Sequence, residues 1–319
     1  MEKLRVSSSP HIHSKRSTRG IMRDVLIALS PAAVASVVLF GLDALFIILS
    51  CVASAVVSEL IFNLICKKPM TIGDLSAVVT GLILALSLPA KTEIWQCVIG
   101  SVFAIVIVKC VFGGLGYNFA NPAATGRILL LLAFAGSVAG GSATAFAEAG
   151  ADLVASSTPL VLIKDGNFSA LPSLLDMFIG NRSGAIGEGC AIALILGGLY
   201  LILRRVIHWH TPVIYIGTVF VLSLIVTKDP LIALYSVLGG GLIMAAFFMI
   251  TDYVTTPINK VGKMIFALGC GVLTVLFRFC GSNPEGVSYA IVLMNIVSPF
   301  IEKLCTYKPL GKVGKKNEK

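Results

Sequence analysis

A run of hydroxyl side chains in a small, polar stretch is the first feature of the sequence that suggests chemistry. Ser156, Ser157 and Thr158 stand in "GADLVASSTPLVLIKDG", residues 150–166, and Pro159 follows them. Proline biases the preceding residue toward an extended backbone. A threonine hydroxyl is not acidic enough to attack a pyrophosphate unaided, so a separate enzyme would have to attach any covalent group here. The alternative is an ordinary turn built from Ser and Thr.

The glycine-rich stretch "NRSGAIGEG", residues 181–189, is a candidate anion site. Backbone N–H groups at Gly184 and Gly187 could bind a phosphate at the start of a helix, and the Arg182 guanidinium suits phosphate oxygens. The pattern is not the G-x-G-x-x-G of a dinucleotide-binding fold. The alternative is a flexible helix start, in which the helix dipole stabilises the negative charge of Glu188 at the N-terminus.

Three polar side chains in two other motifs are candidates for holding a polar ring. Asn118 and Asn121 lie three residues apart in "GYNFANPAATGR", so on a helix they would project from one side. Buried amides need hydrogen-bond partners, which a bound ring would supply. The alternative for Asn121 is helix capping before Pro122. Asp252, beside Thr251, could join the same site or face water.

Few charges lie within the apolar stretches. Glu59 is deep enough to suggest an ion path or a pair with a neighbouring subunit, and the alternative is a hydrogen bond to another helix. Lys109 and Arg278 are expected near helix ends, where their side chains can reach the interface. The eight cysteines are scattered without a C-x-x-C pair, so no metal site is expected.

The elements that must position these residues are membrane helices. Of the 319 residues, 56% are hydrophobic and 13% charged, and the mean hydropathy is +0.93. Such a composition is typical of membrane proteins, and no nucleic-acid partner is expected. The apolar stretches predict an all-α polytopic fold with about ten transmembrane helices. These helices are expected near residues 24–41, 44–66, 74–89, 94–112, 122–138, 188–204, 211–227, 231–250, 262–280 and 286–304.

The positions of Lys and Arg predict the orientation. If both termini are cytoplasmic, all but five of the 25 lysines and arginines lie on the inner side, as the positive-inside rule requires. The expected divisions are a basic cytoplasmic segment at 1–23, helices one to five within 24–138, a long extracytoplasmic loop at 139–187, helices six to ten within 188–304, and a basic cytoplasmic tail at 305–319.

The two halves of the chain contain similar motifs. "TGLILAL" (80–86) resembles "GGLIMAA" (240–246), and "NPAATGR" (121–127) resembles "NPEGVSY" (283–289). Because each half holds an odd number of helices, the halves must have inverted topologies. Inverted repeats place sites near the repeat interface and often contain interrupted helices. The glycines at 239–241 are expected to interrupt helix eight.

Four motifs together resemble one known family. "FFMITDYVTTP" (247–257), "GYNFANPAATGR" (116–127), "SPHIHSKRSTRGIM" (9–22) and "GAIGE" (184–188) are similar to segments of the D subunit of the Rnf complex. They also resemble the B subunit of the sodium-pumping NADH:quinone reductase. The resemblance runs from about residue 9 to residue 304, nearly the whole chain.

The resemblance implies a covalent flavin. In that family a threonine of the outer loop carries FMN through a phosphodiester made by a flavin transferase, and an Asp stands six positions before it. Asp152 and Thr158 keep this spacing, so Thr158 is the expected acceptor. The residues between them depart from the family pattern, which leaves Ser157 as a rival acceptor. Arg182 becomes a candidate partner for the FMN phosphate.

The resemblance also implies a second flavin and partner subunits. In the quinone-reductase relative, asparagines of the matching motif contact a non-covalent riboflavin, which makes Asn118 and Asn121 candidate ligands of one here. The implied function is that of a flavoprotein subunit carrying electrons across the membrane. It would serve a hetero-oligomeric complex that exchanges electrons between ferredoxin and NAD, coupled to export of Na⁺ or H⁺. Nothing in the chain forms a complete active site, so no catalytic residue is expected.

Three alternatives remain open. The chain could be the quinone-reductase B subunit, although only about 23 residues precede the first helix and that relative is usually longer. It could be a non-redox transporter with an inverted repeat, or a scaffold for other redox subunits. In every case we expect a multi-pass protein of the bacterial or archaeal plasma membrane.

Overall fold

A computed structural model describes residues 17–139, 142, 158–281 and 285–305. Within these ranges the chain is helical, and the only β-type pairing is an isolated bridge between Ser142 and Gly184. The all-α fold predicted from hydropathy is confirmed.

The first half of the chain begins with two long helices. α1 (Thr18–Phe40) starts earlier than the expected residue 24, because the Ser17 hydroxyl accepts from the Gly20 N–H at 3.2 Å and caps the helix. α2 (Leu42–Ile65) follows after Gly41. The remaining elements of this half are η1 (Ile72–Asp74), α3 (Ser76–Leu86), α4 (Ile94–Val102), the π-helix η2 (Phe103–Cys110), α5 (Pro122–Ala133) and α6 (Ala135–Val138).

Short elements join the halves, and a second set of helices follows. The joining elements are α7 (Pro159–Lys164), η4 (Phe168–Ala170), α8 (Leu174–Ile179) and η5 (Ile186–Glu188). The second half consists of α9 (Ala191–Leu203), α10 (His210–Thr227), α11 (Pro230–Leu238), α12 (Leu242–Met244), the π-helix η6 (Ala245–Met249), α13 (Lys260–Cys280) and α14 (Val287–Leu304).

Each predicted apolar stretch contains a helix, but the helices differ in length. In the described ranges, 5 helices are long and apolar enough to cross a membrane: α1, α2, α10, α13 and α14. The pair formed by α11 and residues 242–249 passes the same test and is bent by 63°, at the glycines expected to interrupt helix eight. The shorter apolar helices are α3, α4 with η2, α5 and α9.

Packing of the two halves follows one pattern. α2 packs against α3 and α4, and its counterpart α10 packs against α11 and α13. α1 contacts α9, and α5 contacts α14. Each of these two contacts thus packs a helix of one half against the corresponding helix of the other half. This arrangement agrees with the inverted repeat predicted from the motifs.

Small residues allow close approach between helices. A methyl group at Gly197 of α9 would overlap the carbonyl oxygen of Ala28 on α1, and one at Gly81 of α3 would lie 2.8 Å from the Cys51 oxygen on α2. Membrane helices associate through such close backbone contacts.

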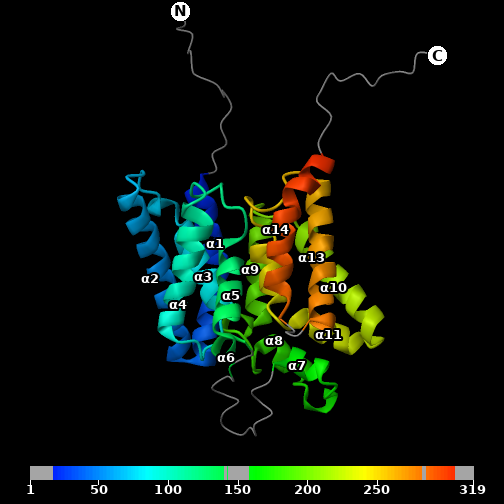
Figure 1. Ribbon diagram of the computed structural model, residues 1–319. Coiled ribbons are helices and arrows are strands. Elements are labelled where there is room, and N and C mark those ends of the chain that lie inside the picture. Colours follow the sequence, from blue (N-terminus) through cyan, green and yellow to red (C-terminus); the bar gives the residue numbers. More distant parts are fainter. Residues whose placement is uncertain (1–16, 140–141, 143–157, 282–284, 306–319) are drawn as a thin grey trace, which may run out of the picture.

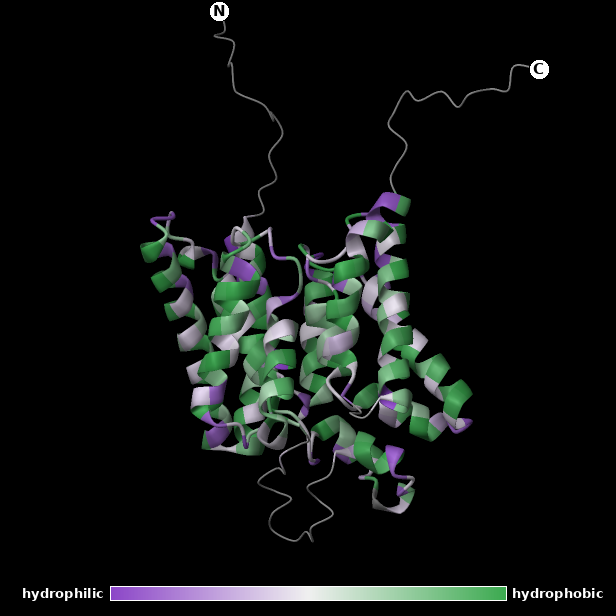
Figure 2. Ribbon diagram, in the orientation of Figure 1, coloured by the Kyte–Doolittle hydropathy of each residue, from purple (hydrophilic) through white to green (hydrophobic). Residues whose placement is uncertain are grey.

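The two ends of the bundle are distinct. The start of α1 and the end of α14 lie at one end, whereas α7 and α8 lie at the opposite end (Figure 1). We call these the terminal end and the loop end. Apolar residues cover the helices between them, and hydrophilic residues gather mainly at both ends (Figure 2).

Candidate functional site

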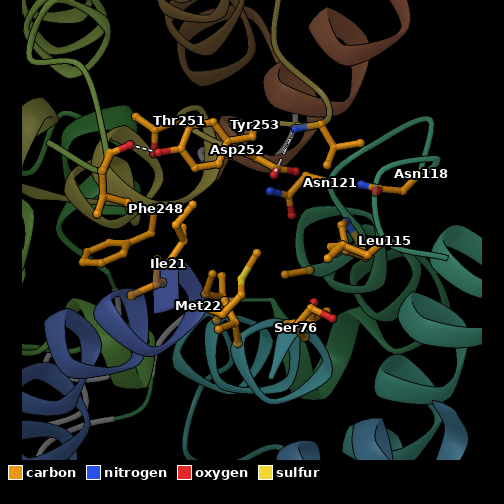
Figure 3. Close-up of a pocket in the computed structure, with 18 of the residues that line it drawn as sticks. Ile21, Met22, Ser76, Leu115, Asn118, Asn121, Phe248, Thr251, Asp252 and Tyr253 are labelled. Carbon is orange, nitrogen blue, oxygen red and sulfur yellow. Dashed lines mark hydrogen bonds between the residues drawn. The ribbon is translucent and has the colours of Figure 1, made fainter. Parts of the chain in front are cut away.

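A pocket at the terminal end collects three of the candidate ligands. Its cavity volume is about 100 Å³, below the range of about 300–1,000 Å³ usual for small-molecule sites, and the space grows to about 780 Å³ when the open mouth is counted. Residues from α1, α3, α5, η6 and the loop after η6 line it. Asn118, Asn121 and Asp252 all face this pocket, which we call the inner pocket (Figure 3).

Asn121 has a structural role as well as a place in the pocket. Its side-chain oxygen accepts from the Ala124 N–H at 3.1 Å and caps α5, which confirms the capping alternative. Its amide nitrogen donates to the Met249 carbonyl at 3.3 Å, which ties the start of α5 to the end of η6. Asn118 precedes the helix, so the two side chains do not share a helical face; its amide nitrogen donates to the Ala120 carbonyl at 3.2 Å.

Asp252 lies in the loop after η6, beside Asn121 in the view of Figure 3. Its carboxylate accepts from the Val254 N–H at 3.3 Å and from the Thr255 hydroxyl at 3.2 Å. Burial raises the pKa of this carboxyl, and the hydrogen bonds from Val254 and Thr255 oppose the shift. Thr251 also lines the pocket and donates to the Phe247 carbonyl at 2.6 Å.

Most of the pocket wall was not predicted from the sequence. Its apolar part includes Ile21 and Met22 of α1 and Phe247 and Phe248 of η6. Phe247 and Phe248 belong to an apolar run, and Ile21 and Met22 stand between polar residues at the start of α1, so nothing in the sequence distinguishes these four from other apolar residues of the chain. Their position near the polar candidate ligands is visible only in the folded chain.

The Lys109 side chain is buried within the protein and does not extend to its surface, contrary to the expectation from its place near a helix end. It is 2% exposed, and its Nζ lies 3.0 Å from Glu59 Oε1. Glu59 therefore pairs with another helix of the same chain, as the simpler alternative held. The partners are 50 residues apart, which is why no local pattern revealed them.

At the loop end, Thr158 stands directly before α7 with Pro159 in the first helical turn. It is 5% exposed, and its Oγ1 has no hydrogen-bond partner among the described residues. The Leu160 side chain lies against Gly239 and Gly240 at the break between α11 and α12. Asp152 and Ser157 lie outside the described residues.

The glycine-rich segment 181–189 is packed into the protein. Gly184 exchanges backbone hydrogen bonds with Ser142 at 3.1 and 3.2 Å, and the Ile186 N–H donates to the Leu88 carbonyl at 2.8 Å. A methyl group at Gly187 would lie 2.6 Å from the Leu86 side chain. In this structure the segment therefore joins the loop end to α3.

Two buried arginines cap the broken helix. Arg182 donates to the Leu238 carbonyl at 2.8 Å and to the Glu188 carbonyl at 3.1 Å. Arg278 donates to the carbonyls of Ser236, Gly239 (3.0 Å) and Gly240 (3.4 Å). The expectation that Arg278 reaches the interface is wrong, because the side chain is held by these carbonyls and is 4% exposed.

Glu188 lies next to this break. Its Oε1 has no hydrogen-bond partner in the described part of the chain, and a methyl group at Gly241 would lie 3.0 Å from that oxygen. The α9 helix begins only at Ala191, so Glu188 stands one turn before it rather than in its first turn.

Comparison with known proteins identifies the family of the chain. The model of the NQR2, RnfD, RnfE family matches residues 5–311. The chain is 46% identical over 310 residues to the D subunit of the Na⁺-translocating ferredoxin:NAD⁺ oxidoreductase complex of Acetobacterium woodii, covering 97% of this chain and 95% of that protein. It is 43% identical to the D subunit of the proton-translocating ferredoxin:NAD⁺ oxidoreductase complex of Clostridium ljungdahlii, covering 93% of each. The D subunit of the ion-translocating oxidoreductase complex of Stutzerimonas stutzeri is 34% identical, again over 93% of each chain. A family model that spans nearly the whole chain, together with a relative 46% identical over 97% of it, shows that this chain belongs to the NQR2, RnfD, RnfE family.

Proposed function

We propose that this chain is the integral-membrane flavoprotein subunit of an Rnf-type complex. Such a complex exchanges electrons between ferredoxin- and NAD-reacting partner subunits and couples the exchange to ion translocation. Family membership across residues 5–311 is the observation that carries the proposal. The names of two relatives differ in the ion, Na⁺ in one and H⁺ in the other, so the proposal covers both.

The first part of the proposal is FMN joined through its phosphate to Thr158. The buried Oγ1, which has no partner among the residues described, supports it, because an unsatisfied buried hydroxyl costs about 1–3 kcal/mol and a phosphodiester removes that hydroxyl. A flavin transferase would make the bond. The positions of Lys and Arg support an extracytoplasmic Thr158 and cytoplasmic termini.

The second part is a non-covalent flavin, such as riboflavin, in the inner pocket. The chemistry of the wall fits an isoalloxazine ring, which has apolar faces and polar edges. Phe247 and Phe248 supply apolar surface, whereas Asn118, Asn121 and Asp252 supply donors and acceptors on one side. A bound flavin would supply the capacity to take up and release electrons. The residues of the chain bind the ring, orient it and exclude water.

Covalent flavin is the first measurement. The protein is expressed with its flavin transferase, and the denatured band is examined for flavin fluorescence beside Thr158→Val and Ser157→Ala. We expect fluorescence in the wild type and in Ser157→Ala but not in Thr158→Val. Thr158 and valine have similar shapes, so loss of the hydroxyl is the main change.

Each other outcome has a defined meaning. A dark wild-type band, with the transferase active on a control protein, would contradict the covalent flavin and favour a transporter or a scaffold. Fluorescence that persists in Thr158→Val and disappears in Ser157→Ala would move the attachment to Ser157.

A further inference from the structure

Among the described residues that line the inner pocket, Lys109 is the one cationic side chain. It belongs to the π-helix η2, and it is 2% exposed. The rest of the wall is mainly apolar, and Asp252 is the one carboxylate that the structure describes in it. A charge in such surroundings acts strongly on a neighbouring group, because the effective dielectric constant is far below that of water.

Two contacts hold the Lys109 ammonium group in place. Its Nζ donates to Glu59 Oε1 at 3.0 Å and to Ser76 Oγ at 2.6 Å. Ser76 begins α3 and lines the pocket itself, and its hydroxyl also donates to Asp74 at 2.5 Å. An ammonium group has three N–H bonds. Two are directed at these oxygens, and the third has no acceptor among the residues that the structure describes.

Glu59 is only partly satisfied by this pairing. Its Oε1 accepts from Lys109 and from the Thr71 hydroxyl, the latter at 2.7 Å. Its Oε2 is buried and has no partner within the described part of the chain. Glu59 does not line the pocket, whereas Lys109 does. Lys109 therefore borders the pocket directly, and the carboxylates of Glu59 and of Asp74, which accepts from Ser76, oppose its positive charge.

We propose that Lys109 is a positioning residue that stabilises the negative charge gained by a flavin in the inner pocket on reduction, and that Glu59 moderates its effect. The inference rests on the inner flavin of the proposed function. One electron leaves a one-electron donor in a partner subunit, which is oxidised, and enters the ring, which is reduced. No bond forms or breaks at Lys109, and the ammonium keeps its proton. Lys109 thus sets how readily the site accepts an electron.

The opposite charges of the pair predict opposite effects. Lys109→Met removes the cation and should lower the affinity for reduced relative to oxidised flavin by about tenfold, which is about 59 mV for a one-electron couple. Glu59→Gln removes the moderating anion and should shift the same ratio the other way. The double variant, Lys109→Met with Glu59→Gln, removes both charges of the pair and leaves neither one unpaired, so it should be the least destabilised of the three. It should resemble Lys109→Met in direction, with a smaller shift.

The experiment is a redox titration of riboflavin bound to the purified full-length protein, followed by visible absorbance. Thr158→Val serves as the background, so that no covalent flavin contributes to the signal. Lys260→Met is the matched control, because Lys260 is exposed at the same end and does not line the pocket. It should leave the potential unchanged.

The outcomes separate this inference from the proposed function. If riboflavin does not bind the background protein, the inner flavin itself is wrong, and the inference falls with it. If riboflavin binds and the double variant keeps the potential of the background protein, Lys109 does not act on the ring and only the inference is overturned. Shifts of the same sign in Lys109→Met and Glu59→Gln would also overturn it, because they would indicate general disruption of the pocket.

Discussion

Arg127 on α5 donates from Nη2 to Glu285 Oε2 at 2.6 Å, and the pair joins the two repeated motifs. Arg127 ends "NPAATGR", and Glu285 follows the Asn-Pro of "NPEGVSY". The side chains are 5% and 10% exposed, so both charges are largely removed from water. The contact between α5 and α14 is thus electrostatic as well as apolar.

Removing one member of this pair should destabilise the protein strongly. Arg127→Leu leaves Glu285 buried and unpaired, and we expect a loss of about 3–5 kcal/mol. Arg127→Leu with Glu285→Leu should recover most of that loss, because neither charge of this pair remains. Thermal unfolding in detergent measures the cycle. Equal losses in the single and double variants would show that the pair does not contribute as a unit.

The contact of α9 with α1 should tolerate no added methyl group. Gly197→Ala would push a methyl into the Ala28 carbonyl, and overpacking costs about 1–3 kcal/mol. Gly217→Ala on α10 is the matched control, because nothing lies within 4 Å of the added methyl. We expect a lower melting temperature for the first variant only. Alanine also favours a helix more than glycine does, so a melting temperature as low for Gly217→Ala would show that the loss does not come from the contact with Ala28.

The raised pKa of Asp252 predicts a pH-dependent stability. A carboxyl with a raised pKa binds its proton more tightly in the folded protein, so it favours folding below its ordinary value of 3.8. That contribution is lost as the pH rises through the raised pKa. Asp252→Asn cannot ionise. The melting temperature of the wild type minus that of the variant should therefore fall from about pH 4 to about pH 8. A constant or rising difference would contradict the shift.

Two natural cysteines test the orientation. Cys66 is exposed after α2 at the terminal end, and Cys280 is exposed where α13 ends at the loop end. A membrane-impermeant maleimide should label Cys280 in intact cells and Cys66 only after permeabilisation, with Cys66→Ser and Cys280→Ser identifying each signal. Labelling of Cys66 in intact cells would reverse the proposed orientation.

Hydropathy was enough to predict the helices but not their detailed form. Long apolar stretches predicted α1, α2 and α13, since spanning helices need such stretches. The glycines at 239–241 predicted the break, because their missing side chains favour unusual backbone conformations; Gly240 and Gly241 indeed have φ values of 64° and 67°. The π-helices η2 and η6 were not predicted, because an apolar run has the same hydropathy whether its backbone forms an α-helix or a π-helix.

The polar residues of the candidate sites were predicted in part. Asn118, Asn121 and Asp252 were found because polar groups are conspicuous in an apolar chain, and they do meet in one pocket. The ion pair of Lys109 with Glu59 was not predicted, because Glu59 belongs to a helix far away in the sequence. Whether a buried charge reaches the interface or meets an opposite charge depends on packing between helices, which local sequence does not encode.

The capping of the broken helix has a consequence for biosynthesis. The carbonyl groups that end α11 are covered by Arg182, which is made before that helix, and by Arg278, which is made after it. Unsatisfied carbonyls are costly in a lipid environment. Until α13 has been inserted, the ribosome-bound intermediate would therefore expose part of this break, and a chain truncated before residue 278 should be a substrate for membrane proteases.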